Sequence, residues 1–272
     1  MCSGPGAVFK LNKNGVFVLC VLIFAFAGSR LGTSRNPSPN PTSDVPVVVE
    51  LFTSEGCSSC PPADALLQKL DAQPYSGVRL IVLSEHVDYW NHIGWTDPYS
   101  SHTFSRRQDA YGSRFHLDSV YTPQMVVDGA EEFVGNSAND ARKAFERAAG
   151  SPKVSVRISG VTRAGDLLRA HLETGPLPSG ARGSDVLIAI ALDHAESQVA
   201  TGENAGRRLA HVAVVRSLSK AGTIASGRAF AHDVSVKLDN QVDPASFRLI
   251  VFIQEPGPGR VLGAAMERVA AR

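Results

Sequence analysis

The segment from residue 47 to residue 70 constrains the fold of this chain more than any other. Apart from one glutamate, residues 47–52 are all apolar, and three of them are β-branched. Such a run is typical of a strand buried on both faces. From Ala63 to Leu70, apolar residues recur at positions i, i+3, i+4 and i+7, which predicts one face of an amphipathic helix. Cys57 and Cys60, separated by two serines, lie between the predicted strand and the predicted helix.

Alternating strands and helices continue to about residue 150. The expected strands cover residues 47–52, 78–83, 125–127 and 131–134, and the expected helices cover residues 63–70, 100–115 and 141–148. Asp128-Gly129 between the last two strands predicts a hairpin with a type I′ turn. Strands that alternate with helices pair in parallel through crossovers, so we expect an α/β domain over residues 46–150, with a mixed sheet flanked by helices.

Beyond residue 151 the pattern predicts strands only. Short runs with alternating or continuous apolar residues are separated by Gly, Pro, Asn and Asp turn signals. The expected strands lie at residues 154–158, 167–172, 186–192, 211–218, 234–238, 247–253 and 261–265. This pattern predicts a smaller β-sandwich-like domain over residues 151–272.

The N-terminus has the features of a targeting segment. Lys10 and Lys13 precede an uncharged apolar run over residues 16–28, and Ala25-Phe26-Ala27 has the small-x-small form that signal peptidase accepts. We therefore expect a signal peptide over residues 1–27, a flexible linker rich in Pro, Ser and Asn over residues 28–45, and a periplasmic or secreted protein. An uncleaved N-terminal anchor is the alternative, and it would be the chain's one contact with a membrane.

The two cysteines carry the chemistry that the sequence predicts. Cysteines three apart on a first helical turn lie within disulfide reach, and a helix N-terminus favours a thiolate at the first of them. A thiolate at Cys57 would be the nucleophile of disulfide exchange, with Cys60 as the resolving cysteine, so we expect Cys57 to be reachable by solvent. Glu55 has the opposite effect, because a nearby carboxylate disfavours the thiolate.

Tyr121-Thr122-Pro123 is the second distinctive motif, because a proline at the start of a strand that pairs internally indicates a special geometry. A strand, a Cys-x-x-Cys, a helix and a later Thr-Pro before a strand together resemble the thioredoxin fold. The resemblance implies that Cys57 is the nucleophile, that Cys60 resolves the mixed disulfide, and that Pro123 is a cis-proline packed against the dithiol.

Longer strings extend this resemblance over most of the chain from residue 47 to residue 265. They are ELFTSEGCSSCPPAD, HVDYWNHIGWTDPYSS, YTPQMVVDG, HVAVVR and GRVLGAA. Together they resemble a family of secreted thioredoxin-like bacterial proteins of unknown function. The chain departs from ordinary thioredoxin at Gly56, where thioredoxin has tryptophan, and at Ser58-Ser59, where it has Gly-Pro, so the direction of any redox reaction stays open.

The loop over residues 85–95 holds both tryptophans of the chain and leaves the carboxyl end of the second strand, where ligands bind in open α/β sheets. We expect Trp90 and Trp95, with Tyr121 and Thr122, to contact the substrate. A lid of tryptophans over the core is the alternative. The polar stretch over residues 203–208 is expected to be a loop, with a binding role as the less favoured alternative, and the histidines beyond residue 151 are given no role.

Three hypotheses of function follow. The first is an extracytoplasmic thiol–disulfide oxidoreductase that acts on protein or small-molecule disulfides and dithiols without a bound cofactor. The second is a copper-binding protein or chaperone with Cys57, Cys60 and His86 or His92 as ligands, since thiolates and imidazole suit copper. The third is a non-catalytic envelope interaction module. Nucleic acid is excluded as a partner, because the net charge is +1 and no block of Lys or Arg is present.

Overall fold

The computed structural model describes residues 44–238 and 246–270. The helices there are α1 (Pro61–Ala72), α2 (His102–Phe115) and α3 (Ala138–Ala149). The strands are β1 (Val45–Thr53), β2 (Val78–His86), β3 (Gln124–Val127), β4 (Glu131–Val134), β5 (Val156–Ala164), β6 (Leu167–Thr174), β7 (Ser184–Gln198), β8 (Arg208–Ile224), β9 (Ala231–Lys237), β10 (Ser246–Gln254) and β11 (Val261–Ala270). The predicted signal peptide and residues 28–43 of the predicted linker lie outside the described residues.

Every strand and helix predicted from periodicity is present, and most of them extend beyond the predicted bounds. The predicted type I′ turn is confirmed, because Asp128 and Gly129 both have positive φ values, 50° and 58°, and Ala130 N–H donates to the Val127 carbonyl at 2.9 Å. Among the described residues, no helix is both long enough and apolar enough to span a membrane.

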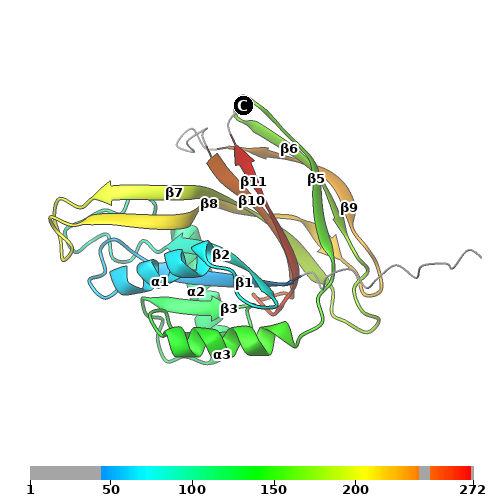
Figure 1. The fold of residues 1–272 in the computed structure, drawn as a ribbon, viewed down its shortest axis with the longest axis horizontal. Helices are drawn as coiled ribbons and strands as arrows, with labels where there is room; N and C mark the ends of the chain where they lie inside the picture. The colour runs from blue at the N-terminus through cyan, green and yellow to red at the C-terminus, as the bar shows by residue number, and fades with distance from the viewer. Residues whose placement is uncertain (1–43, 239–245, 271–272) are drawn as a thin grey trace, which may run out of the picture. The chain divides into compact units, whose positions relative to one another are not determined.

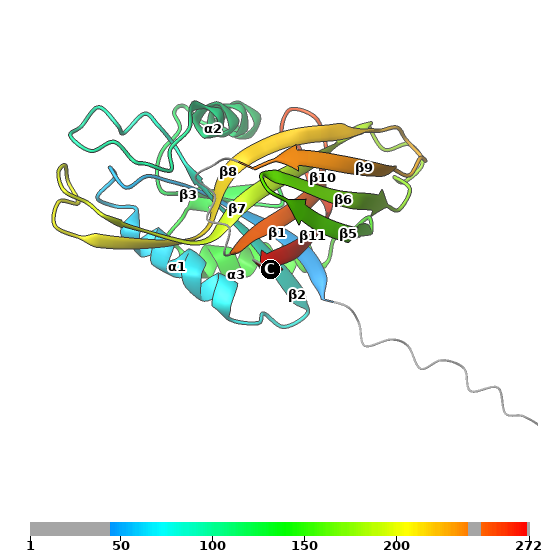
Figure 2. The same ribbon diagram turned by 90° about the horizontal axis from the view of Figure 1, so that it is seen from above.

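Helices cover both faces of the sheet around β1. Leu51 of β1 faces Ala63 of α1 and the core that α3 also joins, whereas the neighbouring Phe52 faces Tyr111 of α2, with ring centroids 5.9 Å apart. Figure 2 shows α2 on the opposite side of these strands from α1 and α3. Because successive side chains of a strand point to opposite faces, β1 is buried on both sides, as its continuous apolar run predicts.

One eight-stranded mixed sheet crosses the predicted domain boundary. Its order is β11-β10-β7-β8-β2-β1-β3-β4, with β1 and β2 parallel and β8 joined to β2 at Ser84 and Val214. All the described residues belong to a single compact unit. The fold is therefore α/β with a large mixed sheet, and the strands after residue 150 do not form a separate sandwich of their own (Figure 1).

The remaining strands form a small second sheet in the order β5-β6-β9. Leu168 and Leu172 of this sheet pack with Ile188, Leu249 and other residues of the large sheet in one apolar core. Two sheets packed face to face resemble the predicted sandwich, but the large sheet provides one of its layers. The domain boundary near residue 150 therefore stays a prediction, and it does not coincide with a division between the two sheets.

A buried polar cluster lies on the α2 side of the large sheet. Arg107 donates through Nε to Glu50 at 2.6 Å, and Tyr111 donates to the same carboxylate at 2.6 Å. Neither carboxyl oxygen of Glu85 has a hydrogen-bond partner within the described residues, although Oε1 lies 3.6 Å from Arg107 Nε. Burial first, and the charge of Glu50 second, raise the pKa of Glu85 well above its usual value, so the neutral acid is favoured at Glu85 while Glu50 is the counter-ion of Arg107.

This assignment predicts that two similar substitutions differ in effect. Glu85→Gln replaces a neutral acid with a neutral amide and should change the free energy of unfolding at pH 7 by less than about 1 kcal/mol. Glu50→Gln removes the counter-ion of a buried guanidinium and should cost about 3 kcal/mol. Urea denaturation of the two variants checks the order, and equal losses would contradict the assignment.

Candidate functional site

Cys57 and Cys60 form a disulfide between β1 and α1, with their Cα atoms 5.4 Å apart. Cys60 is the N-cap of α1, and its carbonyl accepts from Ala63 N–H at 2.8 Å and Asp64 N–H at 3.1 Å. Pro61 and the following proline occupy the first turn, where no N–H needs an intrahelical partner. The expectation that Cys57 lies at the helix N-terminus is wrong, because Cys57 lies three residues before the N-cap Cys60, in the turn that leads into α1.

The expectation that Cys57 is reachable by solvent is also wrong for the disulfide form. Both cysteines have no exposed surface, whereas Ser58 and Ser59 between them are exposed. The Cys57 sulfur lies 3.3 Å from the Ser59 hydroxyl and 3.9 Å from the Thr122 carbonyl oxygen. The sulfur is therefore covered by a small side chain and by the carbonyl of a loop.

The loop before β3 lies against the cysteines, because the Cys57 sulfur is 3.9 Å from the Thr122 carbonyl oxygen. The peptide bond between Thr122 and Pro123 is cis, and the Pro123 carbonyl accepts from Gly135 N–H at 2.9 Å. Trp90 Nε1 donates to the Thr122 hydroxyl at 2.7 Å. The structure thus brings Trp90, Thr122 and Pro123 together beside Cys57, whereas Tyr121 donates its hydroxyl to Glu132 of β4 at 2.6 Å.

A buried charged cluster lies behind the Cys-Ser-Ser-Cys loop. Glu55, with no exposed surface, accepts from Trp95 Nε1 at 2.8 Å and lies 3.2 Å from His211 Nε2 of β8. Asp64 Oδ1 lies 3.7 Å from the other ring nitrogen of His211 and accepts from the Thr53 hydroxyl at 2.9 Å. Trp95 is therefore directed toward Glu55, and the charge of Glu55 is balanced by His211.

The protonation of His211 follows from this cluster. Burial lowers the pKa of His211, but the Asp64 and Glu55 carboxylates outweigh burial and raise that pKa to about 10. The imidazolium form is thus the one present at neutral pH. Sequence reasoning assigned no role to His211; the only signal for one was a polar residue in an otherwise apolar predicted strand.

His86, the histidine of the predicted copper site, is held in a separate pair. Its Nδ1 lies 2.7 Å from Asp97, whose carboxylate also accepts from Glu55 N–H at 2.8 Å. Burial is the largest influence on the pKa of Asp97 and raises it, but the adjacent His86 ring and the backbone N–H groups of Glu55 and Tyr99 outweigh burial and lower that pKa below its usual value. His92 is exposed. Within residues 44–238 and 246–270, no group of three or more His, Cys, Asp or Glu side chains is arranged to hold a metal ion.

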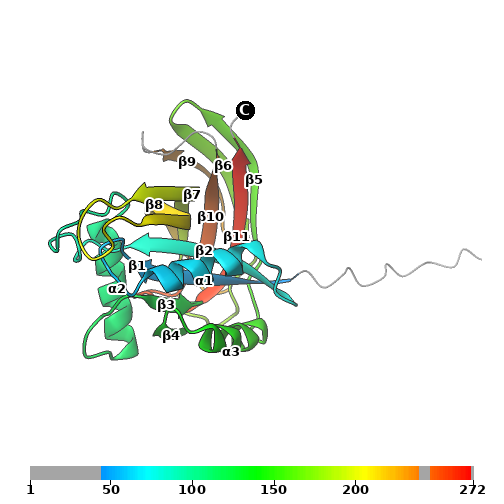
Figure 3. The same ribbon diagram turned by 60° about the vertical axis from the view of Figure 1, so that its left-hand side comes forward.

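The turn between β7 and β8, residues 199–207, is a further part of the site that sequence reasoning missed; we call it the tip. Asn204 of the tip donates to the carbonyls of Glu55 at 2.8 Å and Cys57 at 3.0 Å, and Glu203 accepts from Ser58 N–H at 3.2 Å. Figures 1 and 3 show the β7–β8 hairpin reaching past α1 to the loop that follows β1. The strands of the second half of the chain therefore contribute directly to the surroundings of the cysteines.

Residues 48–254 match the family described as "Protein of unknown function (DUF1223)". The chain belongs to this family. Among solved structures, it is similar to protein AGR_C_4864 from Agrobacterium tumefaciens, with 26% identity, a TM-score of 0.61, and coverage of 82% of this chain and 94% of that one. It is also similar to HBP35 of Porphyromonas gingivalis, with 16% identity, a TM-score of 0.60 and coverage of 82% and 75%, which is a likeness of fold alone. No curated protein matches the chain.

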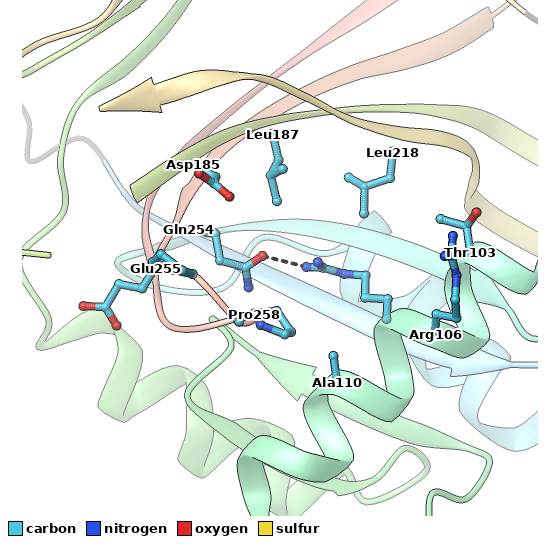
Figure 4. A pocket seen from close by; sticks show the side chains of 12 residues that line it. Thr103, Arg106, Ala110, Asp185, Leu187, Leu218, Gln254, Glu255 and Pro258 are labelled. Atoms are coloured by element: carbon cyan, nitrogen blue, oxygen red, sulfur yellow. Dashed lines mark hydrogen bonds between the residues drawn. The ribbon is translucent and has the colours of Figure 1, made fainter. Parts of the chain in front are cut away.

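A cavity of about 320 Å³ lies away from the cysteines, between α2 and the turn after β10 (Figure 4). Arg106 and Arg107 of α2 line it with Leu187, Leu218 and Gln254. The Arg107 guanidinium is already bound by Glu50 and by Gln254 Oε1, the latter at 3.0 Å. Arg107 in the wall of this cavity therefore belongs to the buried polar cluster on the α2 side of the sheet.

The buried His211 predicts a specific dependence of stability on pH. Because the pKa of His211 is about 10 in the folded protein and 6.5 in its ordinary state, its contribution is fully present below about pH 6.5. The contribution is lost as the pH rises through about 10. The stability advantage of the wild type over His211→Gln, measured by urea denaturation, should therefore shrink across this range. The exposed His92→Gln is the control, and an advantage that stays constant for His211→Gln would contradict the charged cluster.

Proposed function

We propose that this protein is a thiol–disulfide oxidoreductase with a thioredoxin-like arrangement, exported through the predicted signal peptide. One observation carries the proposal: the Cys57–Cys60 disulfide precedes α1 directly, and the Thr122 carbonyl of the loop before β3 lies 3.9 Å from the Cys57 sulfur. A ring closed by two intervening residues restricts the unfolded chain only slightly, so a role in stability explains this bond poorly. A role in exchange explains both the bond and its position.

The reaction exchanges one disulfide for another. In the reduced protein, the Cys57 thiolate attacks one sulfur of a partner disulfide, and the other partner sulfur leaves as a thiolate that takes up a proton. The Cys60 thiol then loses its proton and attacks the Cys57 sulfur. The second partner sulfur leaves, and the Cys57–Cys60 disulfide forms. The partner gains two electrons that the protein loses, and the reverse sequence oxidises a dithiol partner.

Access to Cys57 requires a local movement. The groups over its sulfur are the Ser59 hydroxyl and the Thr122 carbonyl, which lie 3.5 Å apart, and Ser59 is exposed to solvent. Rotation of one serine side chain and a small shift of the loop would open the sulfur, whereas the core below can stay packed. Trp90, which donates to the Thr122 hydroxyl, would then border the bound partner.

The buried cluster supplies proton acceptors near the resolving cysteine. Asp64 lies one helical turn after Cys60, and its backbone N–H donates to the Cys60 carbonyl. His211 lies 3.2 Å from Glu55 and 3.7 Å from Asp64, and in the proposed reaction one of these carboxylates would accept the proton that Cys60 must lose. We infer that this proton transfer is the role of the charged groups buried behind the Cys-Ser-Ser-Cys loop.

Trapping of the mixed disulfide tests the proposed function. In Cys60→Ser, Cys57 can attack a partner, but the mixed disulfide that forms cannot be resolved. Adducts should therefore accumulate in the native compartment, and a dithiol should reduce them and release the partner. The double variant Cys57→Ser, Cys60→Ser is the matched control and should give none. Non-reducing gels and mass spectrometry measure the adducts, and their absence from Cys60→Ser would contradict the proposal.

A further inference from the structure

The peptide group between Cys57 and Ser58 is held on both sides by adjacent residues of the tip. Its carbonyl accepts from Asn204 Nδ2 at 3.0 Å, and its N–H donates to Glu203 Oε2 at 3.2 Å. These contacts join positions 147 and 145 residues apart in the chain. The tip is thus bonded to the backbone of the predicted nucleophile itself.

Asn204 is buried at this contact between the tip and the Cys-Ser-Ser-Cys loop. It has no exposed surface, although its neighbours from Ala200 to Arg208 are all exposed. Its amide nitrogen donates to the Glu55 and Cys57 carbonyls, and its amide oxygen accepts from Arg207 Nη1 at 2.9 Å. All its polar atoms are satisfied in this orientation, whereas a carboxylate of the same shape would place oxygen against two carbonyl oxygens.

The tip is anchored a second time on the loop that follows β2. Gly202, at a φ of 79°, lies so close to Trp95 that a Cβ there would be 3.2 Å from the Trp95 Cβ. Thr201 donates its hydroxyl to the Gly94 carbonyl. The position of Glu203 beside Ser58 is therefore fixed by contacts on both of its sides.

Glu203 brings a negative charge to the residue next to Cys57. The neighbouring cations are engaged elsewhere, since Arg207 donates to Asn204 and Arg208 pairs with Glu196. A carboxylate beside a thiol favours the protonated thiol over the thiolate, and it occupies an N–H that could otherwise stabilise the thiolate. The charged or titratable side chains around the Cys-Ser-Ser-Cys loop are Glu55, Asp64, His86, Asp97, Glu203, Arg207 and His211.

We propose that the tip sets the reactivity of Cys57, with Asn204 as the positioning residue and Glu203 as the charge that disfavours the thiolate. This inference rests on the proposed exchange function and adds the element that tunes it. Reduction of the disulfide by a dithiol transfers two electrons and two protons to the protein. By disfavouring the thiolate, Glu203 makes the reduced protein less stable, so the protein is a weaker oxidant than its Cys-x-x-Cys loop alone would be.

Neutralising Glu203 tests the inference in the full chain. Glu203→Gln keeps the shape and removes the charge, so the Cys57 thiol of the reduced protein should react with iodoacetamide about threefold faster at pH 7. The equilibrium with dithiothreitol should shift in the same direction, toward the reduced protein, but by a smaller factor, because only part of the reduced protein is thiolate at pH 7. Glu146→Gln, which removes an exposed carboxylate from α3, is the matched control and should change neither quantity.

Asn204→Ala tests the positioning role. The loss of Asn204 frees the Cys57 carbonyl and the tip, so both quantities should move in the same direction as in Glu203→Gln. Adding Glu203→Gln to Asn204→Ala should then have little further effect. Circular dichroism confirms that each variant is folded, and an unfolded Asn204→Ala leaves Glu203→Gln as the deciding variant.

Two results would contradict different proposals, the first the role of the tip and the second the exchange function. If wild-type protein equilibrates reversibly with dithiothreitol but Glu203→Gln behaves as Glu146→Gln does, the role of the tip is wrong and the proposed function stands. If the wild-type cysteines do not equilibrate at all, the proposed function fails, and the inference fails with it.

Discussion

The placement of β8 beside β2 is the interaction on which the rest of the structure depends. This contact joins the strands after residue 150 to the helix-flanked strands before it, and the pairing has one bridge, between Ser84 and Val214. It brings His211 behind the Cys-Ser-Ser-Cys loop and carries the tip of the hairpin to the peptide after Cys57. The second half of the chain is thus part of the site rather than an appended module.

Charge compensation explains how so many ionisable groups can be buried around β1 and β2. On the α1 side, one imidazolium is shared by the Glu55 and Asp64 carboxylates, and on the α2 side one guanidinium is shared by Tyr111 and the Glu50 carboxylate. An uncompensated charge at these positions would be costly, because burial removes hydration that only a partner can replace. The same rule favours the neutral acid at Glu85, since Arg107, which lies 3.6 Å from it, is already paired with Glu50.

Local periodicity predicted the elements well because each strand and helix of this chain has its own apolar pattern. It could not predict that β8, rather than another strand of the second half, lies beside β2, because strand pairing over more than a hundred residues leaves no local signal. For the same reason the burial of His211 and the role of Asn204 were missed. The cysteines and Pro123 were found because short motifs carry them, and Trp90 was found because its loop leaves the carboxyl end of a predicted strand. The exposure of Cys57 was predicted wrongly, because it depends on Thr122, a residue from a distant loop.

The burial of Cys57 makes one measurement decisive for the proposed exchange: the rate at which a dithiol reduces the Cys57–Cys60 bond of the folded protein, as a function of urea below the unfolding transition. If a local opening of Ser59 and the Thr122 loop exposes the sulfur, the rate should be measurable without urea and nearly independent of urea concentration. A rate that rises with urea in parallel with the population of the unfolded chain would show that the bond opens only on unfolding, and would contradict a role in disulfide exchange.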